Sequence, residues 1–172
     1  KKIQSLIKEC KNYKIESVLL TQYVSLDKLI EQIDFTKPKT ISCSFHFSKV
    51  ELKTIRNTFK KLRIGIAVNP ENFNVSYLRS IKDIVNVIYY DLNVYKTKSI
   101  RKYSLKKNLD QINLIKALKI PIFIGGGINQ SNVSKIINSV KPDGLDISRS
   151  LKNSKNILSS KKLNSFLSQI SV

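Results

Sequence analysis

The stretch PIFIGGGINQSN, residues 121–132, places three consecutive glycines directly after a short apolar run. Isoleucine and phenylalanine in that run favour a β-strand. The segment after the glycines is rich in Asn and Ser, which is typical of the start of a helix. The whole chain of 172 residues has only five glycines. Three of them therefore mark one strand-to-helix turn, whose bare backbone has no Cβ atoms to keep a ligand away.

The same alternation of an apolar run and an amphipathic segment extends along the whole chain. Helical spacing is clearest in residues 48–62, where apolar residues recur every three or four positions. Further helices are predicted at 3–12, 25–33, 109–118 and 159–170. The predicted strands are SVLLTQ (17–22), TISCSF (40–45), RIGIAV (63–68), VNVIYYD (85–91), IPIFIG (120–125) and GLDIS (144–148).

Strict alternation of strands and helices predicts parallel strands joined by right-handed crossovers. An open doubly wound sheet and a barrel of eight βα units both satisfy this pattern. Two features favour the barrel. The long connection from Leu92 to Lys107 follows the end of a strand, and the glycine turn follows the second-to-last strand, where barrels commonly bind phosphate. We therefore expect an α/β fold of the TIM-type (βα)8 class, with about six strands in this chain and a single domain over residues 1–172.

The formal charge of +19 raises the question of a nucleic-acid partner. The bases are 26 Lys and only 5 Arg, and the chain also has 24 Ile and 15 Asn but only 2 Ala. Drift toward A/T-rich codons explains all of these skews, whereas a nucleic-acid surface explains only the lysines. The lysines are also spread along the chain. We expect no nucleic-acid partner.

The two cysteines, Cys10 and Cys43, form neither a metal-binding pair nor a disulfide framework. This usage is typical of a reduced compartment, so a cytoplasmic location is expected. No run reaches the roughly 18 apolar residues of a membrane span, and no membrane partner is expected. The residues show no cluster with metal-ligand spacing, so neither a metal nor another cofactor is expected. The oligomeric state is left open.

Donor groups follow the last two predicted strands. The glycine turn presents backbone N–H groups at Gly126 and Gly127, and Asn129 or Ser131 is placed to cap the next helix, whose N-terminus favours an anion. About twenty residues later, Ser148, Arg149 and Ser150 end the final strand. Neighbouring strand ends rich in donors predict a phosphate site, although a tight turn alone would also explain the glycines.

Residues 122–153, IFIGGGINQSNVSKIINSVKPDGLDISRSLKN, resemble the C-terminal quarter of phosphoribosylanthranilate isomerases. That family reads approximately F-L-A-G-G-L-N-P-E-N-V, followed by R-P-x-G-V-D-V-S-S-G-V-E. The final KKLNSFLSQI resembles the K-I-x-x-F-I ending of the family. The positions that match are Gly126, Gly127, Asn129, Asn132, Val133, Pro142, Gly144, Asp146 and Ser148.

The resemblance implies an enzyme of tryptophan biosynthesis. It would rearrange N-(5-phosphoribosyl)anthranilate to 1-(2-carboxyphenylamino)-1-deoxyribulose 5-phosphate. VIYYD resembles the sixth strand of the family and places Asp91 on the general acid. The implied phosphate site comprises Gly126, Gly127, Asn129, Ser148 and Arg149, and Asp146 would orient groups of the site.

The same alignment makes the six strands the third to the eighth of the family barrel, and it implies that the single barrel domain over 1–172 is incomplete at its N-terminus. The family's general-base cysteine lies in an earlier K-I-C-G strand, and neither Cys10 nor Cys43 matches it. Arg149, Ser150 and Lys152 stand where the family has Ser, Gly and Glu. Two alternatives stay open: a non-catalytic remnant or segment of a fused pathway enzyme, and another sugar-phosphate barrel such as a ribulose-phosphate epimerase-like enzyme.

Overall fold

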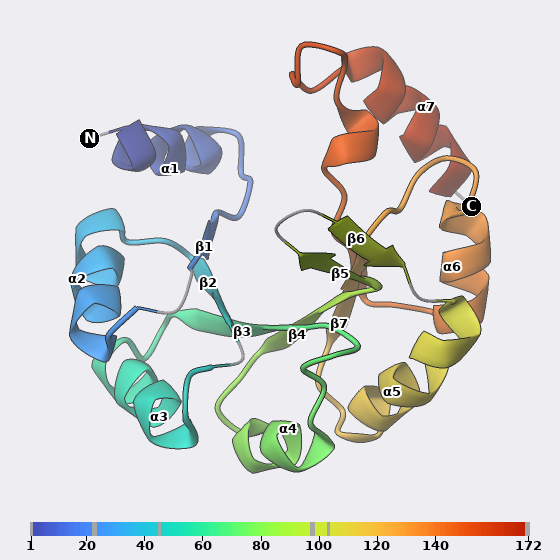
Figure 1. Cartoon of the computed structure of the whole chain (residues 1–172). Helices are drawn as coiled ribbons and strands as arrows, with labels where there is room; N and C mark the ends of the chain where they lie inside the picture. The colour runs from blue at the N-terminus through green and yellow to red at the C-terminus, as the bar shows by residue number, and fades with distance from the viewer. Residues whose placement is uncertain (1, 22–23, 45, 97–98, 103, 171–172) are drawn as a thin grey trace. The chain divides into compact units, whose positions relative to one another are not determined.

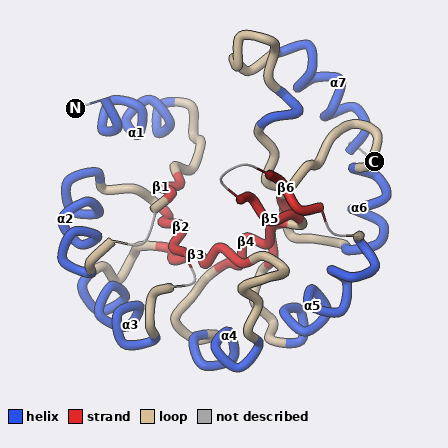
Figure 2. Tube along the Cα trace, viewed as in Figure 1, coloured by secondary structure: helices blue, strands red, loops and turns tan. Residues whose placement is uncertain are grey.

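A computed structural model describes the chain except residues 1, 22–23, 45, 97–98, 103 and 171–172. Strands and helices alternate along the chain (Figures 1 and 2). The hydrogen-bonded order of the six-stranded sheet is β1-β2-β3-β4-β7-β8. The chain forms two compact units. Unit 1 comprises Lys1–Val68 and Asn74–Ile88, and unit 2 comprises Asn69–Phe73 and Tyr89–Val172. The single domain over 1–172 stays a prediction.

Unit 1 begins with three βα repeats whose strands pair in parallel, as the alternation predicts. Strand β2 pairs with β1 from Val18↔Thr40 and with β3 from Thr40↔Arg63. The strands are β1 (Val18–Leu20), β2 (Thr40–Ser44) and β3 (Arg63–Val68), and the helices are α1 (Lys2–Asn12), α2 (Leu26–Thr36), α3 (Lys49–Thr58) and α4 (Val75–Ile81). Helix α1 lies against α2, and Gln4 Nε2 donates a 2.7 Å hydrogen bond to the carbonyl of Phe35.

Helix α3 shows how local sequence sets the helix ends. Ser48 is its N-cap, and Ser48 Oγ accepts a hydrogen bond from the backbone N–H of Glu51 at 3.2 Å. Glu51 Oε2 accepts one in return from the backbone N–H of Ser48 at 2.7 Å, which completes a capping box. Leu52 and Ile55 then bury one face of the helix, in agreement with the predicted spacing.

A buried polar contact joins α3 to the strands of unit 1. Asn86 Oδ1 accepts hydrogen bonds from the backbone N–H of Ile64 at 2.9 Å and from Arg56 Nη2 at 2.6 Å. Arg56 Nη1 also donates to the carbonyl of Leu62 at 2.6 Å. These bonds satisfy backbone groups at the start of β3, where the chain leaves the helix layer and enters the sheet.

Unit 2 contains the remaining regular elements. Strand β4 (Val87–Asp91) contributes its last three residues to this unit. The other elements are strands β7 (Ile122–Gly125) and β8 (Gly144–Leu145), helices α5 (Leu105–Ala117), α6 (Val133–Val140) and α7 (Ser160–Ile170), and the 3₁₀ helix η1 (Arg149–Leu151). Strands β7 and β8 are parallel neighbours, with Ile124 opposite Leu145. The two predicted donor-rich turns therefore follow adjacent strands.

Strand β8 is shorter than the predicted strand over 144–148. Its partner β7 ends at Gly125, and the positive φ angles of Gly126 and Gly127 then turn the backbone away. One further bond, from the backbone N–H of Asp146 to the carbonyl of Ile124 at 2.8 Å, ends the pairing. Ser148 therefore lies beyond the strand rather than inside it.

The long connection after β4 is an antiparallel β-hairpin and not a loop. Strands β5 (Asn93–Lys96) and β6 (Ser99–Lys102) pair from Asn93↔Lys102 to Lys96↔Ser99, and residues 97–98 lie outside the described chain. Its many lysines conceal the alternating pattern that identifies a strand. Among the described residues, none of the helices has the length and apolar character that crossing a membrane requires.

Candidate active site

The alternation of side chains along β4 determines the face of the strand on which the Asp91 side chain lies. The Tyr90 hydroxyl lies 3.0 Å from Asn108 Oδ1 and 2.6 Å from Gln111 Oε1, so Tyr90 faces helix α5. Successive strand residues point to opposite faces of a sheet, so Asp91 shares the other face with Tyr89. Tyr89 packs edge-on against Phe123 of β7, with ring centroids 5.7 Å apart. The carboxyl group of Asp91 therefore lies at the C-terminal end of β4, on the same face of the strand as the Tyr89 ring.

The surroundings of Asp91 favour its protonated form. Burial raises the pKa of its carboxyl group to about 6, against the 2.9 Å hydrogen bond that the backbone N–H of Asn93 donates to Oδ1. The negative charge of Asp146 also raises this pKa, and the positive charge of Arg149 lowers it. A carboxyl group with a pKa near neutrality is partly protonated at physiological pH, which suits a general acid.

The glycine turn packs directly on Asp91. Gly126 has a φ of 92°, and a Cβ atom built on it would lie 2.1 Å from Asp91 Oδ1 and 2.6 Å from the backbone nitrogen of Leu92. Gly127 has a φ of 77°, and its Cβ atom would lie 3.0 Å from Asn93 Nδ2. Both positions therefore need glycine for backbone conformation, and Gly126 also needs it for space. The tight turn therefore explains why Gly126 and Gly127 are glycines. It does not conflict with a role of their backbone N–H groups in binding phosphate.

Two asparagines hold the rest of the turn. Asn132 Nδ2 donates to the carbonyl of Gly127 at 3.0 Å, and Asn132 Oδ1 accepts from the backbone N–H of Asn129 at 2.9 Å. Asn129 Oδ1 accepts from the backbone N–H of Ser131 at 2.9 Å. The N-cap of α6 is Asn132, with no side-chain cap bond, so the predicted cap at Asn129 or Ser131 is wrong. Both of those side chains are used within the turn instead.

The second turn follows β8 and begins the helix η1. Asp146, Ser148 and Arg149 are exposed, as expected for groups that meet a ligand. Ser150 Oγ is buried and has no hydrogen-bond partner within the described part of the chain. A buried hydroxyl normally has a partner, so Ser150 retains an unused donor beside this turn.

These groups surround one cavity of about 410 Å³ in unit 2. All seven predicted site residues line it: Asp91, Gly126, Gly127, Asn129, Asp146, Ser148 and Arg149. Its remaining lining residues are Asn93, Ile100, Lys102, Ile128, Ile147 and Ser150. The structure thus brings together residues from three separate turns, and their roles stay predictions.

The sequence prediction missed the contribution of the hairpin to this cavity. Ile100 and Lys102 of β6 line the cavity, and neither is among the predicted site residues. Asn93 carried no signal, because its contact with the glycine turn depends on the fold. Within the described residues, no group of three or more His, Cys, Asp or Glu side chains is placed to hold a metal ion.

Comparison with known proteins gives one sequence relative and many structural ones. No family model matches the chain. The N-(5'-phosphoribosyl)anthranilate isomerase of Methanococcus voltae is 44% identical over 55 residues, which are 31% of this chain and 82% of that sequence. The structure of N-(5'-phosphoribosyl)anthranilate isomerase from Pyrococcus furiosus superposes with a TM-score of 0.72 at 20% identity, over 97% of this chain and 79% of that one.

Structural similarity alone does not separate this family from other barrels. The 3-keto-L-gulonate-6-phosphate decarboxylase of Vibrio cholerae reaches a TM-score of 0.69 at 15% identity, over 98% of this chain and 77% of that one. At such identities the comparison establishes the fold, a parallel α/β fold of the TIM-barrel type. The match to the Methanococcus voltae protein distinguishes between these families, because it is 44% identical in sequence and spans 82% of that protein. This chain therefore belongs to the N-(5'-phosphoribosyl)anthranilate isomerase family.

Proposed function

We propose that this protein catalyses the Amadori rearrangement of N-(5'-phosphoribosyl)anthranilate to 1-(2-carboxyphenylamino)-1-deoxyribulose 5-phosphate in tryptophan biosynthesis. The observation that carries the proposal is the position of Asp91, whose carboxyl group has a pKa of about 6 and shares one cavity with two donor-rich turns. Family membership supports the choice of substrate. The six parallel-sheet strands are proposed to be the third to the eighth of the family barrel, and a cytoplasmic location is proposed with them.

Asp91 is proposed as the general acid. Protonation of the ribose ring oxygen by Asp91 allows the bond from that oxygen to C1 to break, which opens the ring and leaves a Schiff base at C1. A base then removes the proton from C2, and the resulting enolamine tautomerises to the ketone. Atoms balance, because the substrate gains protons at the ring oxygen and at C1 and loses one from C2 and one from the C2 hydroxyl, which becomes the ketone.

The two turns after β7 and β8 are proposed to hold the phosphate group. Backbone N–H groups at Gly126 and Gly127 have no Cβ atoms in the way, and Arg149 adds a positive charge. The side chain of Ser150, whose buried hydroxyl has no hydrogen-bond partner within the described residues, lies at the same wall of the cavity. Asn129 and Ser148 complete the proposed phosphate site, and Asp146 is proposed to orient the substrate.

The base of the reaction is not Cys43. Its thiol is buried in unit 1, and burial raises its pKa to about 12, which keeps it protonated and unreactive. This agrees with the alignment, in which Cys43 lies within a strand and does not match the family's catalytic cysteine. Cys43 is therefore not proposed as the base of the reaction.

The test compares the full-length wild-type protein with Asp91→Asn and with Asp110→Asn. Turnover of N-(5'-phosphoribosyl)anthranilate is followed by the loss of its fluorescence, normalised to folded protein. Asparagine is nearly isosteric but donates no proton to the ring oxygen, so turnover should fall by about 10²- to 10⁴-fold. Asp110 is exposed on α5 and does not line the cavity, so its variant should retain wild-type turnover.

Three results would contradict the proposal. Turnover of Asp91→Asn within about threefold of wild type would remove Asp91 from the mechanism, because a positioned acid contributes more than that. Wild-type protein that binds the substrate but never converts it would favour the non-catalytic remnant. Conversion of ribulose 5-phosphate instead would favour the epimerase-like alternative.

A further inference from the structure

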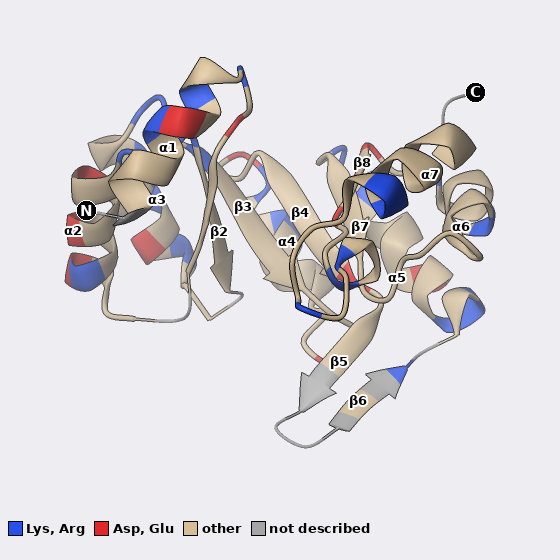
Figure 3. Ribbon diagram, turned by 90° about the horizontal axis from the view of Figure 1, so that it is seen from above, with Lys and Arg blue, Asp and Glu red and all other residues tan. Residues whose placement is uncertain are grey.

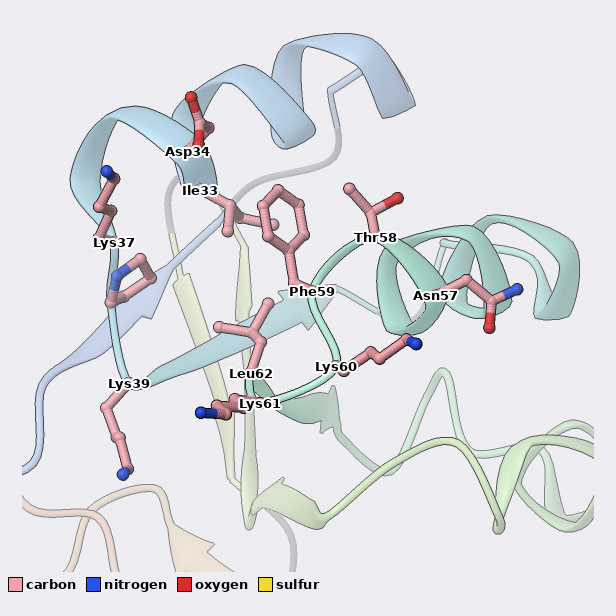
Figure 4. Close-up of a pocket in the computed structure, with 11 residues that line it drawn as sticks. Ile33, Asp34, Lys37, Lys39, Asn57, Thr58, Phe59, Lys60, Lys61 and Leu62 are labelled. Carbon is pink, nitrogen blue, oxygen red and sulfur yellow. The ribbon is translucent and has the colours of Figure 1, made fainter.

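Unit 1 contains a second cavity, of about 570 Å³, that shares no residue with the candidate active site. It lies where helices α2 and α3 end and the chain enters β2 and β3 (Figure 4). Lys37 is the C-cap of α2, and its φ of 48° turns the chain into the strand; Phe59 is the C-cap of α3. The cavity is thus formed by two helix-to-strand connections that are held by their own cap hydrogen bonds.

The centre of this cavity is apolar. Ile33 and Leu62 are buried in the core, and Phe59 is half-buried between them and solvent. Figure 4 shows the side chains of Ile33, Phe59 and Leu62 pointing toward one another. Cavities for small organic molecules are typically about 300–1,000 Å³ and lined by apolar and aromatic side chains, so both the size and the lining suit such a ligand.

The rim of the cavity is positively charged. Four lysines, Lys37, Lys39, Lys60 and Lys61, stand against one carboxylate, Asp34. In Figure 4 the ammonium groups of Lys37, Lys39 and Lys61 lie on the same side of the apolar cluster. The ion pair that the described residues show, Arg63 with Glu16 at 3.2 Å, includes none of these lysines. Their charge is therefore available to a ligand.

We propose that this cavity binds a small organic anion, a carboxylate attached to an aromatic body. The ring would pack against Phe59 and Leu62, and the carboxylate would face Lys39 and Lys61. A second copy of this chain is a poor occupant, because a net charge of +19 makes two copies repel each other. The volume of about 570 Å³, which lies within the range of small-molecule sites, favours a small molecule over an extended acidic peptide.

The probe for the test is 1-naphthoate, and naphthalene-1-carboxamide serves as its neutral counterpart. Affinities are measured by calorimetry on the full-length protein, and the site is located from amide chemical-shift changes in NMR spectra. Naphthoate should shift the amides of Lys39, Phe59 and Leu62 and should bind more tightly than the carboxamide. The double variant Lys39→Gln with Lys61→Gln should weaken naphthoate about fivefold to twentyfold, as expected for the loss of two partly solvated charges.

The matched control is Lys11→Gln with Lys155→Gln, which removes two exposed lysines that do not line the cavity. It should leave the affinity for naphthoate unchanged. Equal affinity for naphthoate and the carboxamide would overturn the proposal, and so would equal weakening in both double variants. Chemical-shift changes confined to residues around Asp91 would also overturn it. None of these measurements depends on turnover, so their outcome is independent of the proposed isomerase activity.

Discussion

Both burial and neighbouring charges affect the pKa of the Asp91 carboxyl group. Its carboxyl group accepts a backbone hydrogen bond from Asn93, which stabilises the charged form, yet burial dominates and raises the pKa to about 6. Asp146 and Arg149 then act in opposite directions on the same group. The acid strength of Asp91 is therefore adjustable from two residues that line the same cavity.

A first prediction concerns the pH dependence of turnover. An acid must be protonated to act, so kcat/KM should fall as the pH rises through about 6, the pKa of Asp91 in the free enzyme. Asp146→Asn removes a negative charge, which lowers this pKa and should move the falling limb to lower pH. Arg149→Gln removes a positive charge and should move the limb to higher pH. The measurement is kcat/KM from pH 4.5 to 9 for the three proteins.

The opposite directions of the two shifts separate this explanation from a general loss of structure. Damage to the site would reduce kcat/KM at every pH without moving the limb. Shifts of both variants in the same direction would show that the limb belongs to another group than Asp91.

At the scale of elements, the turn after β7 places the glycines against Asp91. Gly126→Ala should destabilise the protein by about 2 to 4 kcal/mol, since it adds a backbone penalty at positive φ to a collision with Asp91 and Leu92. Gly127→Ala shares the positive φ but meets only the amide of Asn93, so it should cost about 1 kcal/mol. Urea unfolding of the two variants measures both values.

Equal destabilisation by the two glycine substitutions would mean that backbone conformation alone requires glycine. In that case the contact between Gly126 and Asp91 would have no energetic role. Gly126→Ala should also abolish the fall of kcat/KM as the pH rises through about 6, because Asp91 must move to admit the new methyl group.

Helix α3 allows a second prediction at this scale. Ser48→Ala removes the hydroxyl that accepts from the backbone N–H of Glu51 and should lower the free energy of unfolding by about 1 kcal/mol. Thr54→Ala in the same helix is the control, because its hydroxyl bonds only to the carbonyl of Val50 within the helix. It should change stability by less than about 0.5 kcal/mol. The same loss in both variants would contradict a specific role of the cap.

At the scale of the whole molecule, charge is the dominant feature. The chain has 31 basic and 12 acidic residues, and Figure 3 shows basic residues on many separate elements. Self-repulsion of this kind destabilises the folded state and is screened by salt. Raising NaCl from about 20 mM to 300 mM should therefore raise Tm by about 2 to 4 °C, which corresponds to roughly 1 kcal/mol for a chain of this size.

The salt experiment uses chloride salts, because sulfate bound at the proposed phosphate site would itself stabilise the protein. KCl should reproduce the effect of NaCl at equal ionic strength. A Tm that stays constant or falls would show that the lysines are not a net source of repulsion.

The sequence by itself determined most of the strands and helices of this protein and most of the chemistry of its candidate site. The alternation of apolar runs and helical spacing predicted the parallel strands and the helices between them, because both patterns express local burial. The glycine run and the strand that ends at Asp91 are local signals as well. Together with the matching motif around Gly126 and Asp146, they were enough to select seven of the thirteen residues that line the cavity.

Only the tertiary structure decided how these residues act on one another. The 2.1 Å approach that a side chain at Gly126 would make to Asp91 joins residues 35 positions apart, so no local pattern contains it. The raised pKa of Asp91 depends on burial and on charges from the turn after β8. The hairpin that brings Lys102 to the cavity and the shortening of β8 depend on which strand lies alongside, and pairing partners are set by packing over long distances in the chain.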